Sequence, residues 1–188
     1  MTYFLQLTIN AIALGSIYAL TAVGYSMVYG ILELVNFAHG SVFMLGAFSY
    51  YIFAVLVGLP WYLSFLITFI LIGIVGFAYD RLTLLPLRRT NQPKFTGLIC
   101  TLGVSIVLQN LVFVFMGSNT RQFPTFFEGR YLSLGPFNIS FIQILIVCLS
   151  VAIMVALSLF VKKAKLGVAM RAVAQNSMAS EWMGINVN

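Results

Sequence analysis

Long runs of apolar residues, separated by short polar segments, dominate this chain of 188 residues. A helix needs roughly 20 apolar residues to cross the hydrocarbon core of a bilayer, which is about 30 Å thick. The pattern predicts five transmembrane helices, over residues 5–24, 41–58, 60–79, 95–116 and 141–161. The last of these runs carries no charged residue. We therefore expect an all-α, polytopic integral membrane protein built as a helical bundle.

Composition and charge support the same class of protein. The chain is 61% hydrophobic and only 7% charged, whereas soluble domains carry about 25% charged residues. The net charge of +6 lies in short segments between apolar runs, which is typical of membrane orientation and not of a nucleic-acid-binding face. Cys100 and Cys148 fall inside apolar runs, so we expect small buried hydrophobes without a disulfide or metal role.

The distribution of Lys and Arg predicts the orientation. Segment 80–94 has four basic residues against one Asp, and segment 162–188 has four against one Glu. Two spans separate these segments, so both should lie on the cytoplasmic face. The segment 117–140 is then an extracytoplasmic loop, and the N-terminus lies outside. Residues 1–6 carry no Lys or Arg, which favours a retained first helix over a cleavable signal.

Polar residues gather between the first two predicted spans. Two crossings use about 40 of the first 58 residues, so residues 25–40 are not needed for either crossing. This surplus predicts a broken or re-entrant helix there. Such backbone is tolerated at membrane depth only where it is buried in protein or lines a watery cavity. This stretch and the residue after it contain Glu33, Asn36, His39, Gly40 and Ser41. On the residues alone, a pathway-lining segment and an interfacial turn both remain open.

Chemistry limits what this cluster can do. On a helix, Glu33, Asn36 and Gly40 would share one face, with His39 beside them. One His and one Glu do not supply the three or four ligands of a zinc site, so we expect no metal. No Ser/His/Asp arrangement is spaced across facing helices, and the single histidine would have to serve alone, so we do not expect an enzyme.

A second polar pair, Gln109 and Asn110, lies inside the fourth predicted span. Adjacent residues diverge by about 100° around a helix, so both cannot face one narrow pathway. An interhelical hydrogen bond is as good an interpretation as substrate contact. The small residues Thr101, Gly103 and Ser105 precede the pair and suit close helix packing.

The tail breaks the transmembrane pattern. Residues 168–182 contain no Pro or Gly and are too polar for a crossing. They predict a cytoplasmic helix that ends at Gly184, a residue type favoured just beyond helix C-termini. Composition leaves open whether this helix lies on the membrane surface or docks a soluble partner. We take 162–188 as a cytoplasmic segment within a single domain over 1–188.

Three separated blocks carry a family resemblance. The stretches GSIYALTAVGYSMVYGILELVNFAHGSVFMLGAF, LICTLGVSIVLQN and LGVAMRAVAQN…ASEWMGIN together resemble the permeases of ABC transporters for branched-chain amino acids. The resemblance implies an inner-membrane subunit of a bacterial or archaeal importer of leucine, isoleucine, valine or related small solutes. Members of that family continue for roughly another 100 residues, so we expect this chain to be truncated at its C-terminus.

The resemblance also implies partners and sites. The partners are a second permease subunit (in a homo- or heterodimer), two cytoplasmic ATPase subunits, an extracytoplasmic solute-binding protein and the lipid membrane, but no nucleic acid. ATP is used by the ATPase, and this chain binds no cofactor and lacks the G-x-x-x-x-G-K-[ST] phosphate loop. The implied translocation-pathway residues are Asn36, His39, Gly40, Ser41, Gln109 and Asn110. The implied ATPase-coupling residues are Arg171, Ala172, Gln175, Asn176, Ala179 and Gly184.

One alternative from a different class is an ion-coupled secondary transporter or channel. Glu33 and His39 would then form a proton relay, because ionisable groups at membrane depth often do so. Such a protein would transport in ATP-depleted vesicles that carry only an ion gradient. An ATP-driven importer would not.

Overall fold

A computed structural model describes residues 2–32, 35–89, 94–123, 131–134 and 137–185. The chain forms two compact units. The first comprises Met1–Glu33 with Phe127–Asn188, and the second comprises Leu34–Phe126. Each unit is described by itself below. The expectation of a single domain over 1–188 stays a prediction.

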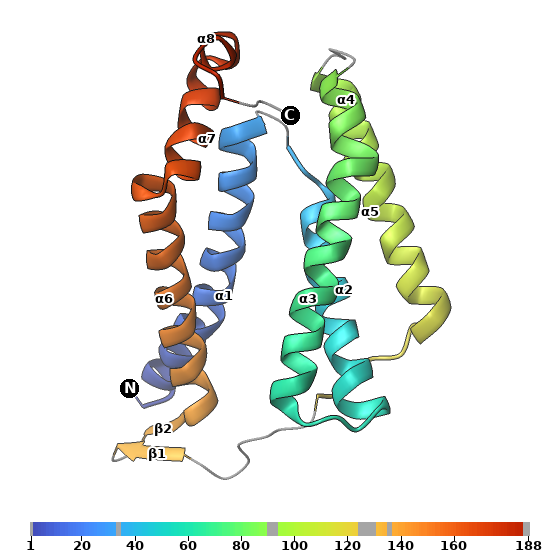
Figure 1. The fold of residues 1–188 in the computed structure, drawn as a ribbon. Coiled ribbons are helices and arrows are strands. Elements are labelled where there is room, and N and C mark those ends of the chain that lie inside the picture. The colour runs from blue at the N-terminus through green and yellow to red at the C-terminus, as the bar shows by residue number, and fades with distance from the viewer. Residues whose placement is uncertain (1, 33–34, 90–93, 124–130, 135–136, 186–188) are drawn as a thin grey trace. The chain divides into compact units, whose positions relative to one another are not determined.

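The first unit is a helix pair with a short hairpin and two further helices. Helix α1 (Thr2–Leu32) packs beside α6 (Phe141–Lys163) (Figure 1). Strands β1 (Tyr131–Leu134) and β2 (Phe137–Ser140) precede α6 and pair antiparallel, with Tyr131 opposite Ser140 and Leu134 opposite Phe137. After α6 come α7 (Lys165–Gln175) and α8 (Ser177–Trp182). The hairpin is the one departure from the all-α prediction in the described residues.

Gln143 ties the start of α6 to its neighbours. Its side-chain oxygen accepts a hydrogen bond from the Ser140 backbone N–H at 3.1 Å, which satisfies a backbone group where β2 becomes α6. Its amide nitrogen donates to the Asn10 side chain of α1 at 2.8 Å. One side chain therefore fixes the helix start and joins α6 to α1.

The second unit consists of three membrane-length helices. Helix α2 (Ala38–Tyr51) continues through the π-helical turn η1 (Ile52–Leu56). Helix α3 (Trp61–Tyr79) continues through the π-helical turn η2 (Asp80–Leu84) into α4 (Leu85–Arg89). Helix α5 is Lys94–Met116. Figure 1 shows these helices, and α2 contacts both α3 and α5.

Within the described part of the chain, five helices are long and apolar enough to cross a membrane, which confirms the predicted spans. They cover Tyr3–Gly30, Ala38–Leu56, Trp61–Leu87, Phe95–Met116 and Phe141–Lys163. Two of them, the first and the third, are much longer than predicted. The third reaches into the predicted polar segment 80–94, and the first extends well beyond residue 24. A helix satisfies its own backbone groups, so it need not end where the apolar run meets the membrane surface.

The predicted break between the first two spans is real but narrower than 25–40. Helix α1 is continuous to Leu32, so residues 25–32 are helical and that part of the prediction is wrong. Among the described residues, only 35–37 lie between α1 and the start of α2 at Ala38. The estimate of 20 residues per crossing failed because α1 is 31 residues long, about 46 Å at 1.5 Å per residue. Glu33 lies outside the described residues.

Burial in the described residues is inverted relative to a water-soluble protein. Large apolar side chains face outward, such as Phe69 at 71% exposure and Val114 at 77%. Seven of the buried positions carry small hydroxyl side chains, namely Ser41, Ser49, Ser64, Thr101, Ser105, Ser150 and Ser180. Small residues let helix backbones approach closely in a bilayer, where apolar burial gives no driving force between helices. This is the packing of a membrane protein.

Candidate functional site

The start of α2 is held by the Asn36 side chain. Its Oδ1 atom accepts from the Ala38 backbone N–H at 3.1 Å, the local turn that Asn side chains form with the residue two positions on. The Tyr79 hydroxyl of α3 donates to the same oxygen at 2.8 Å. Asn36 is 9% exposed. The break before α2 is therefore an ordered corner of the chain, and a side-chain hydrogen bond fixes it to α3.

Thr101 of α5 supports the same corner from the other side. Its side chain is fully buried. The hydroxyl accepts from the Phe37 backbone N–H at 3.4 Å and lies within donating distance of the Leu98 carbonyl at 3.0 Å and the Val35 carbonyl at 3.4 Å. Backbone groups that the break frees from helical bonding thus find a partner on α5, as buried backbone polar groups require.

One further turn along, α2 and α5 meet through three polar side chains. The Ser41 and Ser105 hydroxyl oxygens lie 2.7 Å apart and are buried. The Gln109 amide donates to Ser41 at 3.2 Å and to Ser105 at 3.1 Å. Thr101, Ser105 and Gln109 recur every four residues, so they lie on one face of α5. We call Asn36, Ser41, Tyr79, Thr101, Ser105 and Gln109 the polar seam.

A cavity of about 690 Å³ lies along α2 and α3. Most of its wall is apolar, as is usual for small-molecule sites that carry a few polar groups. Three side chains in the wall carry polar atoms: His39, Tyr50 and Thr68. The Thr68 hydroxyl oxygen is buried and has no hydrogen-bond partner among the described residues. The remaining lining residues are Val42, Phe43, Gly46, Ala47, Phe65, Phe69, Ile72, Gly73 and Phe123.

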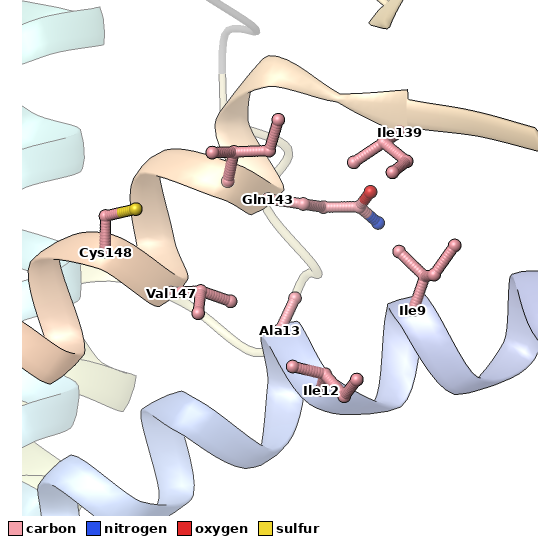
Figure 2. A pocket seen from close by; sticks show the side chains of 8 residues that line it. Ile9, Ile12, Ala13, Ile139, Gln143, Val147 and Cys148 are labelled. Atoms are coloured by element: carbon pink, nitrogen blue, oxygen red, sulfur yellow. The ribbon is translucent and has the colours of Figure 1, made fainter. Parts of the chain in front are cut away.

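A smaller cavity of about 210 Å³ lies in the first unit, where β2 and α6 face α1. Figure 2 shows Gln143 pointing toward Ile139 and Ile9, among apolar side chains. The polar atoms of that Gln143 amide already bond Ser140 and Asn10. Cys148, also in this wall, is exposed, so the expectation that it is buried is wrong. This cavity offers little polar chemistry to a ligand.

The tail forms two helices instead of the one predicted over 168–182. Asn176 separates α7 from α8 with an extended backbone, and its side chain accepts from the Ala179 N–H at 3.0 Å, which caps α8. Residue Gly184 has a φ of 81°. Its N–H bonds the Glu181 carbonyl, and the Ile185 N–H bonds that of Ser180, the bonding pattern of a glycine-terminated helix. The predicted end at Gly184 is correct.

Met178, Trp182 and Met183 of the tail are 62%, 82% and 85% exposed. They lie outside the membrane-length helices. Exposed apolar side chains on such a segment can contact either the membrane surface or a protein partner.

Comparison with known proteins decides the family. The family described as branched-chain amino acid transport system, permease component, matches residues 7–188. The chain belongs to this permease family. It is 35% identical, over 99% of its length, to the high-affinity branched-chain amino acid permease proteins BraD of Pseudomonas aeruginosa and LivH of Escherichia coli K12. A probable LivH permease of Methanocaldococcus jannaschii is 28% identical over 95% of the chain.

The chain spans 64% of the length of the BraD and LivH proteins and 57% of the Methanocaldococcus protein. No solved structure matches it. Its membership in a permease family, together with five apolar helices, makes it a multi-pass inner-membrane protein.

The permease fold brings together some of the predicted pathway residues and separates others. Asn36, Ser41 and Gln109 belong to the polar seam. His39 instead lines the cavity along α2 and α3. The Asn110 amide donates to the Ile106 carbonyl of its own helix at 2.8 Å and is exposed, so the adjacent pair diverges as expected. Gly40 is exposed, with no atom within 4 Å of the position a Cβ would take. Their role in translocation stays a prediction.

Two seam residues carried a weak signal in the sequence. Thr101 and Ser105 read as small packing residues, and both are buried against α2. Gly103, predicted to pack with them, is exposed. Tyr79 was missed, because a tyrosine at the end of an apolar run is also typical of a membrane interface.

The predicted coupling residues lie along α7, α8 and their junctions. The Arg171 side chain points back and donates to the Lys162 carbonyl of α6 at 3.2 Å. The Ala172 carbonyl accepts from the Asn176 N–H, and that of Ala179 from the Met183 N–H. Gln175 and Ala179 are exposed. The structure therefore joins Arg171 to the membrane helix α6, whereas the exposed side chains of α8 remain accessible.

Proposed function

We propose that this chain is part of the permease subunit of an ABC importer for branched-chain amino acids or related small solutes. The match of residues 7–188 to a branched-chain amino acid permease family carries the proposal. The five apolar helices supply the membrane domain such a subunit needs. The chain lacks a phosphate-binding loop, so a separate ATPase hydrolyses ATP. A second permease and an extracytoplasmic binding protein complete the assembly.

The orientation follows from charge. We place 80–94 and 162–188 on the cytoplasmic side, because positively charged short segments are retained there. The N-terminus then lies outside. A cysteine introduced at exposed Lys163 should react with an impermeant maleimide only in inverted vesicles. Reaction from the outside of intact cells would overturn the orientation.

The cavity along α2 and α3 is the wall of the solute path in this proposal. A zwitterionic amino acid must replace its lost water with hydrogen bonds, and its aliphatic side chain needs apolar wall. His39, Tyr50 and the unpartnered Thr68 hydroxyl supply polar contacts, while Val42 and Ile72 belong to the apolar wall. The seam groups on the α5 side of α2 already bond one another, which makes them supports of the path.

The exposed face of α8 is the ATPase-docking surface in this proposal. Met178 and Trp182 supply exposed apolar contacts there, and large aromatic residues commonly anchor interfaces. The capping bond of Asn176 and the turn at Gly184 fix both ends of α8. A short helix fixed at both ends presents these side chains at low entropic cost.

Two measurements on the complete complex test the function. The full-length subunit should retain its ATPase partner through purification, and uptake of radiolabelled leucine into proteoliposomes should require internal ATP. Uptake driven by an ion gradient in ATP-free vesicles would instead support the ion-coupled alternative through Glu33 and His39. The family match supports the permease role and not that alternative.

A further inference from the structure

Helix α6 turns into α7 over a single residue. Ala164 has an extended backbone, with φ −71° and ψ 143°. Its N–H donates to the Phe160 carbonyl at 2.9 Å, the last helical bond of α6, and its carbonyl accepts from the Val168 N–H at 2.9 Å, which begins α7. So short a junction leaves the chain little slack, and the packing of the two helices on each other sets the angle.

Gly167 is where α7 meets α6. It is buried in the first turn of α7. A Cβ at this position would lie 2.6 Å from the Val161 carbonyl oxygen and 2.7 Å from the Val161 Cα, and closer still to the Phe160 carbonyl oxygen. All three neighbours are backbone atoms, so no side-chain movement relieves the clash. Glycine is required here because two backbones touch.

Arg171 adds a second contact between α7 and the end of α6, one turn further along α7. It lies four residues after Gly167, on the same face of α7. Its guanidinium donates to the Lys162 carbonyl at 3.2 Å, one of the last four carbonyls of α6 that have no partner within the helix. A positive charge at a helix C-terminus also interacts favourably with the negative end of the helix dipole.

We infer that Gly167 and Arg171 are positioning residues that lock α7 onto the end of α6, so that a displacement of α8 reaches the membrane helix. Arg171 then acts on α6 and not on the ATPase, in contrast to the docking role that the family resemblance implied. Helix α7 also contacts α1, which braces the corner on a second membrane helix. The coupling part of this inference rests on the proposed function.

The rigidity of the corner is measured by spin-label distances in the complete transport complex. Labels are placed at exposed Val151 of α6 and exposed Val168 of α7, with Cys100 and Cys148 replaced by serine. The unaltered corner should give a narrow distance distribution. Gly167→Ala and Arg171→Gln should broaden or shift it, and Arg171→Lys, which keeps a donor and the charge, should restore it in part. Lys165→Gln removes one charge from the same helix and is the matched control.

Transport and ATPase binding separate the two roles of Arg171. Arg171→Gln should leave ATPase binding unchanged while uptake falls at least about threefold, the scale of a lost coupling contact. Trp182→Ala on α8 should weaken ATPase binding itself. Equal loss of binding in both variants would make Arg171 a docking residue and overturn the inference. Unchanged distances and uptake in Arg171→Gln would overturn it as well.

A failure of the proposed function would look different. If the unaltered complex binds no ATPase, the importer assignment and the coupling role both fall. The distance measurement would still report whether Gly167 and Arg171 hold the corner. If Gly167→Ala does not fold, Arg171→Gln alone decides the outcome.

Discussion

The hydroxyl oxygens of Ser41 and Ser105 lie 2.7 Å apart and join α2 to α5 in a buried position. Both also receive the Gln109 amide. Three polar side chains that could have faced a pathway thus bond one another. Hydrogen bonds between membrane helices average about 0.6 kcal/mol and reach about 1.7 kcal/mol, so the group should contribute measurably to stability.

Ser41→Ala and Ser105→Ala should each lower the free energy of unfolding in bilayers by about 0.5–1.5 kcal/mol, because each leaves buried polar atoms short of a partner. In the double variant the losses should be less than additive, with a coupling of about 0.6 kcal/mol or more. Unfolding in mixed bicelles with increasing SDS measures all four proteins. Asn110→Ala, which removes a bond only within α5, is the control. Strictly additive losses would show that the two hydroxyls do not interact.

The corner before α2 gives a second prediction. Tyr79→Phe removes one donor to Asn36 Oδ1 and should cost about 1 kcal/mol. Asn36→Ala removes the turn that starts α2 as well and should cost about 0.5–2 kcal/mol by itself, the range for a lost cap.

Phe37 is an exposed position in the corner. The rate at which a thiol reagent labels Phe37→Cys reports local opening of this corner. The rate should rise more in the Asn36 variant than in the Tyr79 variant. Tyr62 lies on α3, like Tyr79, and is exposed, so Tyr62→Phe is the matched control. A Tyr79→Phe protein with an unaltered labelling rate would show that the hydroxyl does not hold the corner.

Thr68 and Thr101 allow the roles of the cavity and of the polar seam to be tested separately. Thr68 has an unpartnered hydroxyl in the cavity wall, whereas the Thr101 hydroxyl is bonded and fully buried. Thr68→Val should leave stability unchanged and raise the KM for uptake several-fold. Thr101→Val should cost about 1–3 kcal/mol in stability, because its backbone partners are left buried without a bond.

Uptake kinetics in proteoliposomes and thermal unfolding of the same preparations check this pair. An unaltered KM in Thr68→Val would remove the cavity from the solute path. A fall in stability equal to that of Thr101→Val would give Thr68 a structural role instead.

The turn after α8 gives a fourth prediction. Gly184 adopts a φ of 81°, a conformation that costs a residue with a Cβ about 1–2 kcal/mol and that Asn tolerates better. Gly184→Val should loosen the end of α8 and weaken ATPase binding, while Gly184→Asn should largely preserve it. Binding of the purified ATPase to the reconstituted permease measures both. Equal affinities for the two variants would show that ATPase docking does not depend on the geometry of this turn.

The amino-acid sequence by itself determined the five membrane helices and the family. An uncharged run such as 141–161 can exist stably only as a membrane helix, because each backbone group in lipid needs a partner within its own segment. Gly184 as the end of the tail helix was equally local, because few residues other than glycine accept its backbone angles.

The tertiary structure alone decided which polar groups meet. Residues 25–40 were predicted as a break because a crossing was assigned a fixed length, yet α1 continues to Leu32 because a helix costs little to extend beyond the hydrocarbon. Asn36 and Tyr79 are 43 residues apart, and Ser41 and Ser105 are 64 apart. No local pattern couples such positions. Only the packing of α2 against α3 and α5 brings them within hydrogen-bonding distance. In the same way, the close backbone contact at Gly167 holds α7 where the Arg171 side chain reaches the Lys162 carbonyl of α6.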